Sequence, residues 1–123
     1  MADILRVAKT TEIDWNNVSC IPCVMFMNAM ACFMDTHNSF IRMPMGNGKT
    51  VVLFCIPRAT LQEIIRKVDN MSDDLFTGMF DLYDDVLEDE VPERGEFLDT
   101  LMIMNWWSDP KVDHILFEYE LTD

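Results

Sequence analysis

Basic residues are scarce in this sequence. Its 123 residues include nine Lys and Arg against 22 Asp and Glu, which gives a net charge of −13 at pH 7. Binding to nucleic-acid phosphates or to an anionic membrane surface requires clusters of basic side chains. We therefore expect no direct contact with nucleic acid and none with a membrane. The charge favours a protein partner with a basic surface.

A long hydrophobic run is also missing. The nearly apolar stretch 20–34 has fifteen residues and is interrupted by a proline and an asparagine, whereas a membrane-spanning helix needs about 20 residues. The segment before it carries Asp3, Glu12 and Asp14 in place of the basic start of a signal peptide. Four unclustered cysteines and eleven methionines are typical of a reducing compartment. The sequence thus predicts a cytoplasmic protein, in the host cytoplasm if a virus encodes it.

The acids that are present are unevenly distributed. Residues 1–68 carry five acids and seven bases, whereas residues 69–123 carry seventeen acids and two bases. The segment from Asp69 to Asp99 is densest, with twelve acids and one base, Arg94. Because this segment is also rich in apolar residues, we expect it to fold and not to form an acidic tail. The length predicts one domain over 1–123.

Hydrophobic periodicity predicts an α+β fold, with a single small mixed sheet packed against three to four helices. A central hairpin is expected over 39–56, with its turn at the glycines on either side of Asn47. An alternating strand is expected over 113–121 and a short strand over 3–8. Pro44 predicts that its strand lies at an edge or contains a bulge. The order of elements resembles a split βαβ arrangement with added helices.

The helices are expected over 22–35, 60–70, 73–90 and 93–107, with one further helical turn over 11–18.

Local signals refine these segments. Thr60 and Glu63 have the spacing of a capping box, and Ser72 has the position of an N-cap. The continuous apolar run 51–54 predicts a strand buried on both faces. The first helix is apolar on all sides and is expected at the centre of the core.

A helical wheel over 73–90 separates an apolar face from an acidic face. The apolar face comprises Leu75, Phe76, Met79, Phe80, Tyr83, Val86 and Leu87. The acidic face comprises Asp74, Asp81, Asp85 and Glu88, flanked by Asp84 and Asp89. Like charges at i,i+4 cost about 0.2–0.5 kcal/mol per pair. The eight acids of this segment would follow one another at roughly 3.4 Å along the helix, close to the phosphate spacing of one DNA strand.

Trp106 and Trp107 form a second unusual feature. Adjacent helical residues point about 100° apart, so we expect that the two indoles are not both fully buried, and tryptophan is enriched in interface hot spots. We therefore expect a partner-binding site made of this pair and the acidic helix face. Its residues are Asp74, Asp81, Asp84, Asp85, Glu88, Asp89, Trp106 and Trp107.

This pattern favours a small acidic inhibitor that occupies the basic groove of a nucleic-acid-handling protein, in the manner of a DNA mimic. A nuclease, a restriction or defence complex and a polymerase are all possible targets. Virus-encoded anti-defence proteins and toxin-immunity proteins share this size and charge. The alternative interpretation is a solvated acidic face on an adaptor or structural subunit that binds through an apolar surface. We expect no catalytic activity from either.

A third interpretation concerns the segment from Cys20 to Cys23, which has the CxxC spacing. These four residues resemble the active site of the thioredoxin family. The resemblance implies a thiol oxidoreductase in which Cys20 attacks and Cys23 resolves. The family's tryptophan before the first cysteine is replaced here by Ser19. The later proline, Pro57, is followed by a predicted helix where the family has a strand.

The other motifs predict no cofactor and no metal. The segment 46–50 (GNGKT) resembles the end of a phosphate-binding loop, but it lacks the first glycine at position 43 and precedes a strand, so it predicts a hairpin turn. Zinc binding by Cys20 and Cys23, with Cys32 or His37, would rest on a single cysteine pair. The acids 81, 84 and 85 lack the spacing of a calcium loop.

Overall fold

The computed structural model describes residues 3–10, 12, 14–18, 21–34, 40–46, 48–82 and 88–121. In chain order the elements are β1 (Ile4–Ala8), β2 (Trp15–Val18), α1 (Cys23–Ala31), β3 (Phe40–Gly46), β4 (Lys49–Pro57), α2 (Arg58–Asp69), α3 (Asp73–Met79), the 3₁₀ turns η1 (Phe80–Leu82) and η2 (Glu88–Glu90), α4 (Arg94–Trp107) and β5 (His114–Leu121). Within these residues no helix is both long and apolar enough to cross a membrane.

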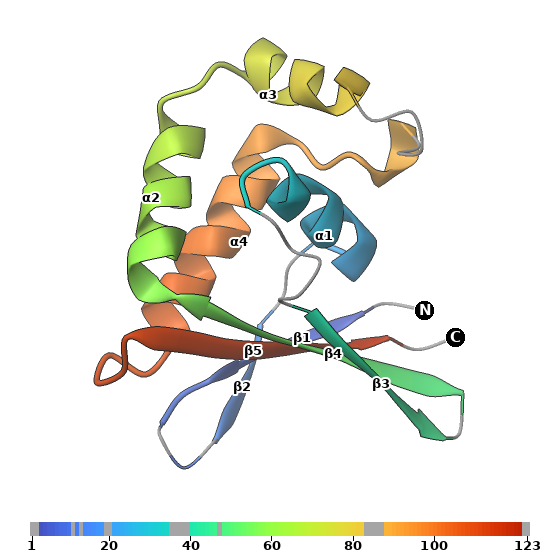
Figure 1. The fold of residues 1–123 in the computed structure, drawn as a ribbon, viewed down its shortest axis with the longest axis vertical. Coiled ribbons are helices and arrows are strands. Elements are labelled where there is room, and N and C mark those ends of the chain that lie inside the picture. Colours follow the sequence, from blue (N-terminus) through green and yellow to red (C-terminus); the bar gives the residue numbers. More distant parts are fainter. Residues whose placement is uncertain are drawn as a thin grey trace.

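The strands form one five-stranded sheet in the order β2-β1-β5-β4-β3. This confirms the α+β class. Each described strand pair is antiparallel, so the sheet is not the mixed sheet that we expected. The last strand, β5, inserts between β1 and β4 and runs against both, so β1 and β4 are parallel with one strand between them. This agrees with the predicted split βαβ arrangement, to which β2 and β3 add the two edges. The helices all lie on one side of the sheet, and α3 lies farthest from it (Figure 1).

The segment that we expected to form a helical turn is the edge strand β2. It pairs with β1, with Val18 opposite Leu5 and Trp15 opposite Ala8. The amide of Lys9 donates to the carbonyl of Asp14 at 2.7 Å and closes the turn between them. Aromatic and β-branched residues favour a strand once an edge is available for pairing, and β1 supplies that edge.

The predicted hairpin is confirmed as β3 and β4. Gly46 and Gly48 both have φ of +75°, a conformation that glycine adopts without steric cost. The register shifts between Pro44 and Gly46, and β3 is an edge strand, as Pro44 predicted. The expected burial of the run 51–54 on both faces is only partly met: on the outer face Val51 is buried, but Leu53 is half-buried and the next residue on that face, Cys55, is exposed. No described helix covers that face of the sheet (Figure 1).

The core lies between the sheet and the helices, and Phe26 of α1 is at its centre. Its ring lies 5.6 Å from that of Phe117, 5.7 Å from Tyr119, 5.9 Å from Phe97 and 6.4 Å from Phe54. These rings come from α1, α4, β4 and β5. One face of α1 therefore lies at the centre of the core, as predicted. Its other face reaches solvent, where Val24 is 44% exposed.

Among the described helices, α3 begins with a side-chain cap, whereas α1 and α2 each begin directly after a proline without one. Ser72 caps α3 as predicted, since its Oγ accepts the Leu75 amide at 3.1 Å. The capping box expected at Thr60 is wrong, because the helix begins two residues earlier, directly after Pro57. Proline ends the strand at a φ of −59° that already suits a helix start.

The single helix expected over 73–90 is also wrong. The α-helix ends at Met79, and the chain continues in the 3₁₀ turn Phe80–Leu82. Gly78 sits in the last turn, where glycine costs about 1 kcal/mol relative to alanine. Phe76 and Phe80 are buried as expected, but Leu75, assigned to the apolar face, is 58% exposed.

Candidate partner-binding surface

Arg94 positions the acidic elements against one another. Its Nε donates to Asp73 Oδ1 at 2.6 Å, and another guanidinium nitrogen donates to the carbonyl of Val68 at 3.1 Å. These contacts join the start of α4 to α3 and to the end of α2. The one base of the densest acidic segment is thus engaged within the fold.

The acids around Arg94 face solvent. Eight of the described acids between positions 69 and 99 are exposed: Asp69, Asp73, Asp74, Asp81, Asp89, Glu93, Glu96 and Asp99. Within the described part of the chain, the structure pairs one of these eight with a base, Asp73 with Arg94. A surface with so many carboxylates and so little internal neutralisation carries a strong negative potential.

The six acids predicted as binding residues are not arranged as expected. Asp74 lies on α3, Asp81 on η1 and Asp89 on η2, and all three are exposed. Asp84 and Asp85 lie outside the described residues, as does the side chain of Glu88. Because the α-helix ends at Met79, these carboxylates do not form one evenly spaced row, and the match to DNA phosphate spacing is lost.

The two predicted tryptophans are confirmed as surface residues at the end of α4. Trp106 is 78% exposed and Trp107 is 44% exposed, and their ring centroids lie 5.2 Å apart. Neither indole is buried in the core. Tryptophan is enriched in partner-binding hot spots, so the exposed pair is a candidate anchor.

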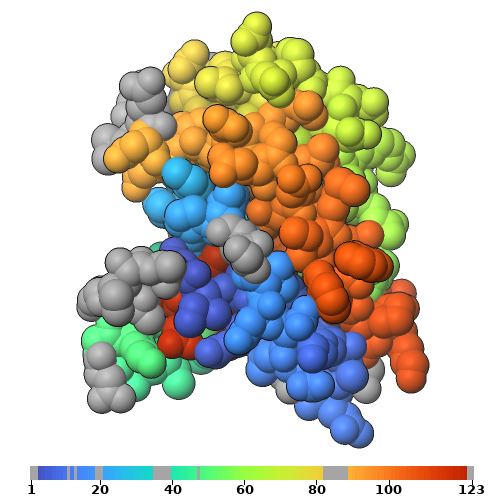
Figure 2. All heavy atoms as spheres, turned by 180° about the vertical axis from the view of Figure 1, so that it is seen from behind, coloured from blue at the N-terminus to red at the C-terminus, as the bar shows by residue number. Residues whose placement is uncertain are grey.

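Sequence reasoning missed the residues that connect the acids to the tryptophans. Asp99, Met102 and Trp106 occupy i, i+3 and i+7 of α4, so they form one strip along the helix. Asp99 is exposed, and Met102 is 52% exposed. The spacing was visible in the sequence, but only the packing of α4 shows that this strip faces outward. Figure 2 shows α4 in orange across this side of the molecule.

Arg58 holds the tryptophan end of α4 in place. Its guanidinium donates to Asn105 Oδ1 at 3.0 Å and to the carbonyls of Asp109 at 2.6 Å and Val112 at 3.3 Å. Its amide donates to the carbonyl of Asp113 at 2.6 Å. One side chain at the start of α2 therefore fixes the end of α4 and the loop that leads into β5.

The acidic and aromatic parts are close enough for one interface. Glu96 and Trp106 are ten residues apart on α4, which is about 15 Å at 1.5 Å per residue. A standard protein interface buries about 800 Å² on each partner and is wider than this separation. We call the exposed residues Asp73, Asp74, Asp81, Asp89, Glu93, Glu96, Asp99, Met102, Trp106 and Trp107 the acidic–aromatic surface.

The cysteine motif is only partly described. Cys20 lies outside the described residues, and Cys23 is 2% exposed. The Cys23 amide at the start of α1 donates to Asp3 Oδ2 at 2.8 Å, so a carboxylate occupies the helix end that would otherwise favour a thiolate. Burial raises the pKa of the Cys32 and Cys55 thiols.

The remaining motifs are now placed. Lys49, in the segment that resembles a phosphate-binding loop, begins β4 and pairs with Glu120 at 3.3 Å. Among the described residues, no group of three or more His, Cys, Asp or Glu is arranged to hold a metal ion. Of the zinc ligands considered, Cys20 and His37 lie outside the described residues.

Comparisons with protein-family models, with curated proteins and with solved structures find no match for this chain.

Proposed function

We propose that this protein is an inhibitor that binds a basic, nucleic-acid-handling protein through its acidic–aromatic surface. One observation carries the proposal: the seven exposed carboxylates of this surface come from a segment with a single base, Arg94, and α4, which begins in that segment, ends in an exposed tryptophan. Charge of one sign beside an exposed aromatic anchor suits a desolvated contact with a complementary surface.

The two parts of the surface have different roles. The carboxylates steer a basic partner into contact and raise the association rate, an effect that salt screens. Trp106 supplies a large apolar area that the partner can enclose, and such anchors contribute about 2 kcal/mol or more to binding. Removing charge should therefore slow association, whereas removing Trp106 should speed dissociation.

A nucleic-acid-binding groove is the basic surface that this proposal favours. Such grooves present Lys and Arg to phosphates, and carboxylates can occupy the same positions. Competition needs negative charge on the inhibitor's surface, and the exposed acids on α3, η2 and α4 support the proposal in this respect. The inhibitor would block the groove without contacting nucleic acid.

The first test is a pull-down from native host extract, with stepwise elution in salt and identification of partners by mass spectrometry. We expect a basic, nucleic-acid-handling protein to elute between about 0.2 and 0.6 M salt, where the screening length falls below 10 Å. A partner that remains bound above this range, but is lost with Trp106→Ala, would contradict the charge-driven mechanism and favour the adaptor.

A matched pair of variants tests the site. The first combines Asp74→Lys, Asp89→Lys and Asp99→Lys, on the acidic–aromatic surface. The control combines Glu12→Lys, Asp14→Lys and Asp113→Lys, three exposed acids on the loops before β2 and β5, far from α3 (Figure 1). Both variants change the net charge equally. Capture should fail for the first and persist for the control, and equal loss in both would contradict a defined acidic site.

A further inference from the structure

One face of the sheet points away from the helices, and among the described residues no helix covers it (Figure 1). We call it the open face. Neighbouring residues in a strand point to opposite faces of the sheet. Leu5, Val52 and Phe117 are buried in the core, so the residues next to them in each strand lie on the open face. Its apolar part crosses three strands, with Leu53 opposite Ile41, Val51 opposite Met43, and Cys55 opposite Leu116. We call Ile41, Met43, Val51, Leu53, Cys55 and Leu116 the open-face strip.

The open-face strip reaches solvent at its β3 end. Ile41 is 55% exposed and Met43 is 36% exposed, and Met45 near the turn is 58% exposed. A hollow of about 270 Å³ lies between these apolar residues and a charged group; its lining comprises Met43, Met45, Val51, Arg6, Lys49, Glu118 and Glu120. Exposed methionines around a hollow adapt their shape to an apolar neighbour.

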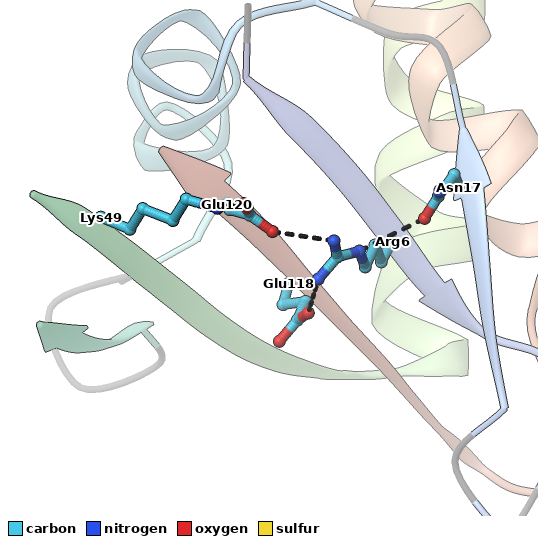
Figure 3. A network of polar contacts seen from close by, with 5 residues as sticks. All are labelled: Arg6, Asn17, Lys49, Glu118 and Glu120. Carbon is cyan, nitrogen blue, oxygen red and sulfur yellow. Dashed lines mark hydrogen bonds and ion pairs between the residues drawn. The ribbon is translucent and has the colours of Figure 1, made fainter. Parts of the chain in front are cut away.

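The open face also carries charged residues, and their charges cancel. The Arg6 guanidinium lies 3.1 Å from Glu118 and 2.8 Å from Glu120, and Glu120 also lies 3.3 Å from Lys49 (Figure 3). Asn17 accepts a further hydrogen bond from Arg6 at 3.3 Å. Two bases thus balance two acids, in a molecule whose net charge is −13.

We propose that two copies of this chain associate through their open faces, with the open-face strip at the centre of a two-fold interface. A patch that is apolar and electrically neutral is complementary to itself, which a two-fold interface requires. A basic partner would instead be drawn to the acidic–aromatic surface. The proposal does not depend on the function proposed above.

Charge also favours this orientation of two copies. The acidic–aromatic surface lies on the helical side, so a dimer formed through the sheets places the two acidic surfaces at opposite ends. Packed sheets lie about 10 Å apart with a helical layer outside each, which separates the acidic surfaces by roughly 30 Å. This exceeds the screening length of about 10 Å at 0.1 M salt, so repulsion between the copies is weak.

The available area suits an interface at the small end of the usual range. Strands β1, β5, β4 and β3 span about 19 Å at 4.8 Å per strand, and eight residues of β5 extend about 26 Å. The flat area is about 500 Å² before side chains add to it, and standard interfaces bury about 800 Å² per partner. Pairing through the β3 edge is disfavoured, because Pro44 lacks an amide donor and the register shifts beside it.

The test is the mass of the intact protein by light scattering and sedimentation, from about 1 to about 300 µM, a range that populates dimers of micromolar Kd. We expect twice the monomer mass at high concentration, undiminished by 0.5 M salt, because salt weakens only the remaining repulsion. A monomer throughout this range overturns the proposal.

A matched pair of variants locates the interface. Ile41→Lys with Met43→Lys alters two exposed residues of the open-face strip and should give a monomer. Leu75→Lys with Met102→Lys alters two residues of the helical side that are at least as exposed and should leave the dimer intact. The opposite pattern would place the contact on the helices and overturn the proposal.

A second measurement uses the unaltered protein. Cys55 lies in the open-face strip and is exposed, so dimer formation should cover it. We expect its alkylation rate constant, followed by mass spectrometry, to fall several-fold between the lowest and highest protein concentrations. A rate constant that does not change with concentration, in a protein that is a dimer by mass, would overturn the assignment to this face.

Discussion

Arg58 connects three parts of the fold, and its removal should have a large effect on stability. The guanidinium donates to the side chain of Asn105 and to the carbonyls of Asp109 and Val112. Hydrogen bonds from a charged donor contribute about 1.5–3 kcal/mol each when buried. Because this site is half-buried and water can replace part of each bond, we expect Arg58→Met to cost about 2–4 kcal/mol in total.

The assay is urea unfolding at neutral pH, together with thermal unfolding. For a chain of this length the loss corresponds to a fall of roughly 8–15 °C in Tm. Arg58→Lys keeps the charge but lacks the planar guanidinium. We therefore expect its loss of unfolding free energy to be more than half of the loss in Arg58→Met. Hydrogen exchange should accelerate at the end of α4 in both variants.

Arg66→Met is the control, because Arg66 is exposed on the same helix and its removal changes the net charge equally. We expect its unfolding free energy to stay within about 0.5 kcal/mol of the wild type. The reasoning is refuted if Arg58→Met is as stable as the Arg66→Met control, since the hydrogen bonds would then contribute nothing.

Three further predictions concern the cap, the core and the sheet face. Ser72→Ala should cost about 1 kcal/mol through loss of the Leu75 amide bond, while Ser72→Asp should retain most of the stability in the same urea assay. Phe26→Ala should cost about 3–5 kcal/mol, and an unfolding free energy within 1 kcal/mol of the wild type would contradict its central position. The hydrogen bond from Lys49, with the nearby guanidinium of Arg6, lowers the pKa of Glu120 below its usual 4.5. This stabilisation is therefore complete above pH 4.5 and is lost as the pH falls through the lower folded-state pKa. Glu120→Gln should flatten that acid-side decline in urea unfolding curves measured between about pH 2.5 and 7.

Part of the candidate site could be predicted from the sequence. Adjacency on a helix indicated that Trp106 and Trp107 are not both buried, although only the structure shows that both are exposed. The acidity of the segment that begins at Asp69 follows from composition. The arrangement of the acids could not be predicted. A helical wheel over 73–90 assumes an unbroken helix. In the structure the α-helix ends at Met79, where Gly78 has weak helical propensity and Phe80 packs into the core.

Local patterns alone determined the hairpin at Gly46 and Gly48, the alternation of β5, the cap at Ser72 and the concentration of negative charge. These features depend on neighbouring residues, so they can be recognised without knowledge of the fold. The tertiary structure decided that β1 pairs with β5, more than 100 residues away, and that 15–18 becomes a strand on the edge so created. It also decided which face of the sheet stays open and which strip of α4 faces outward. Each of these results depends on contacts between distant segments, whose partners no local pattern specifies.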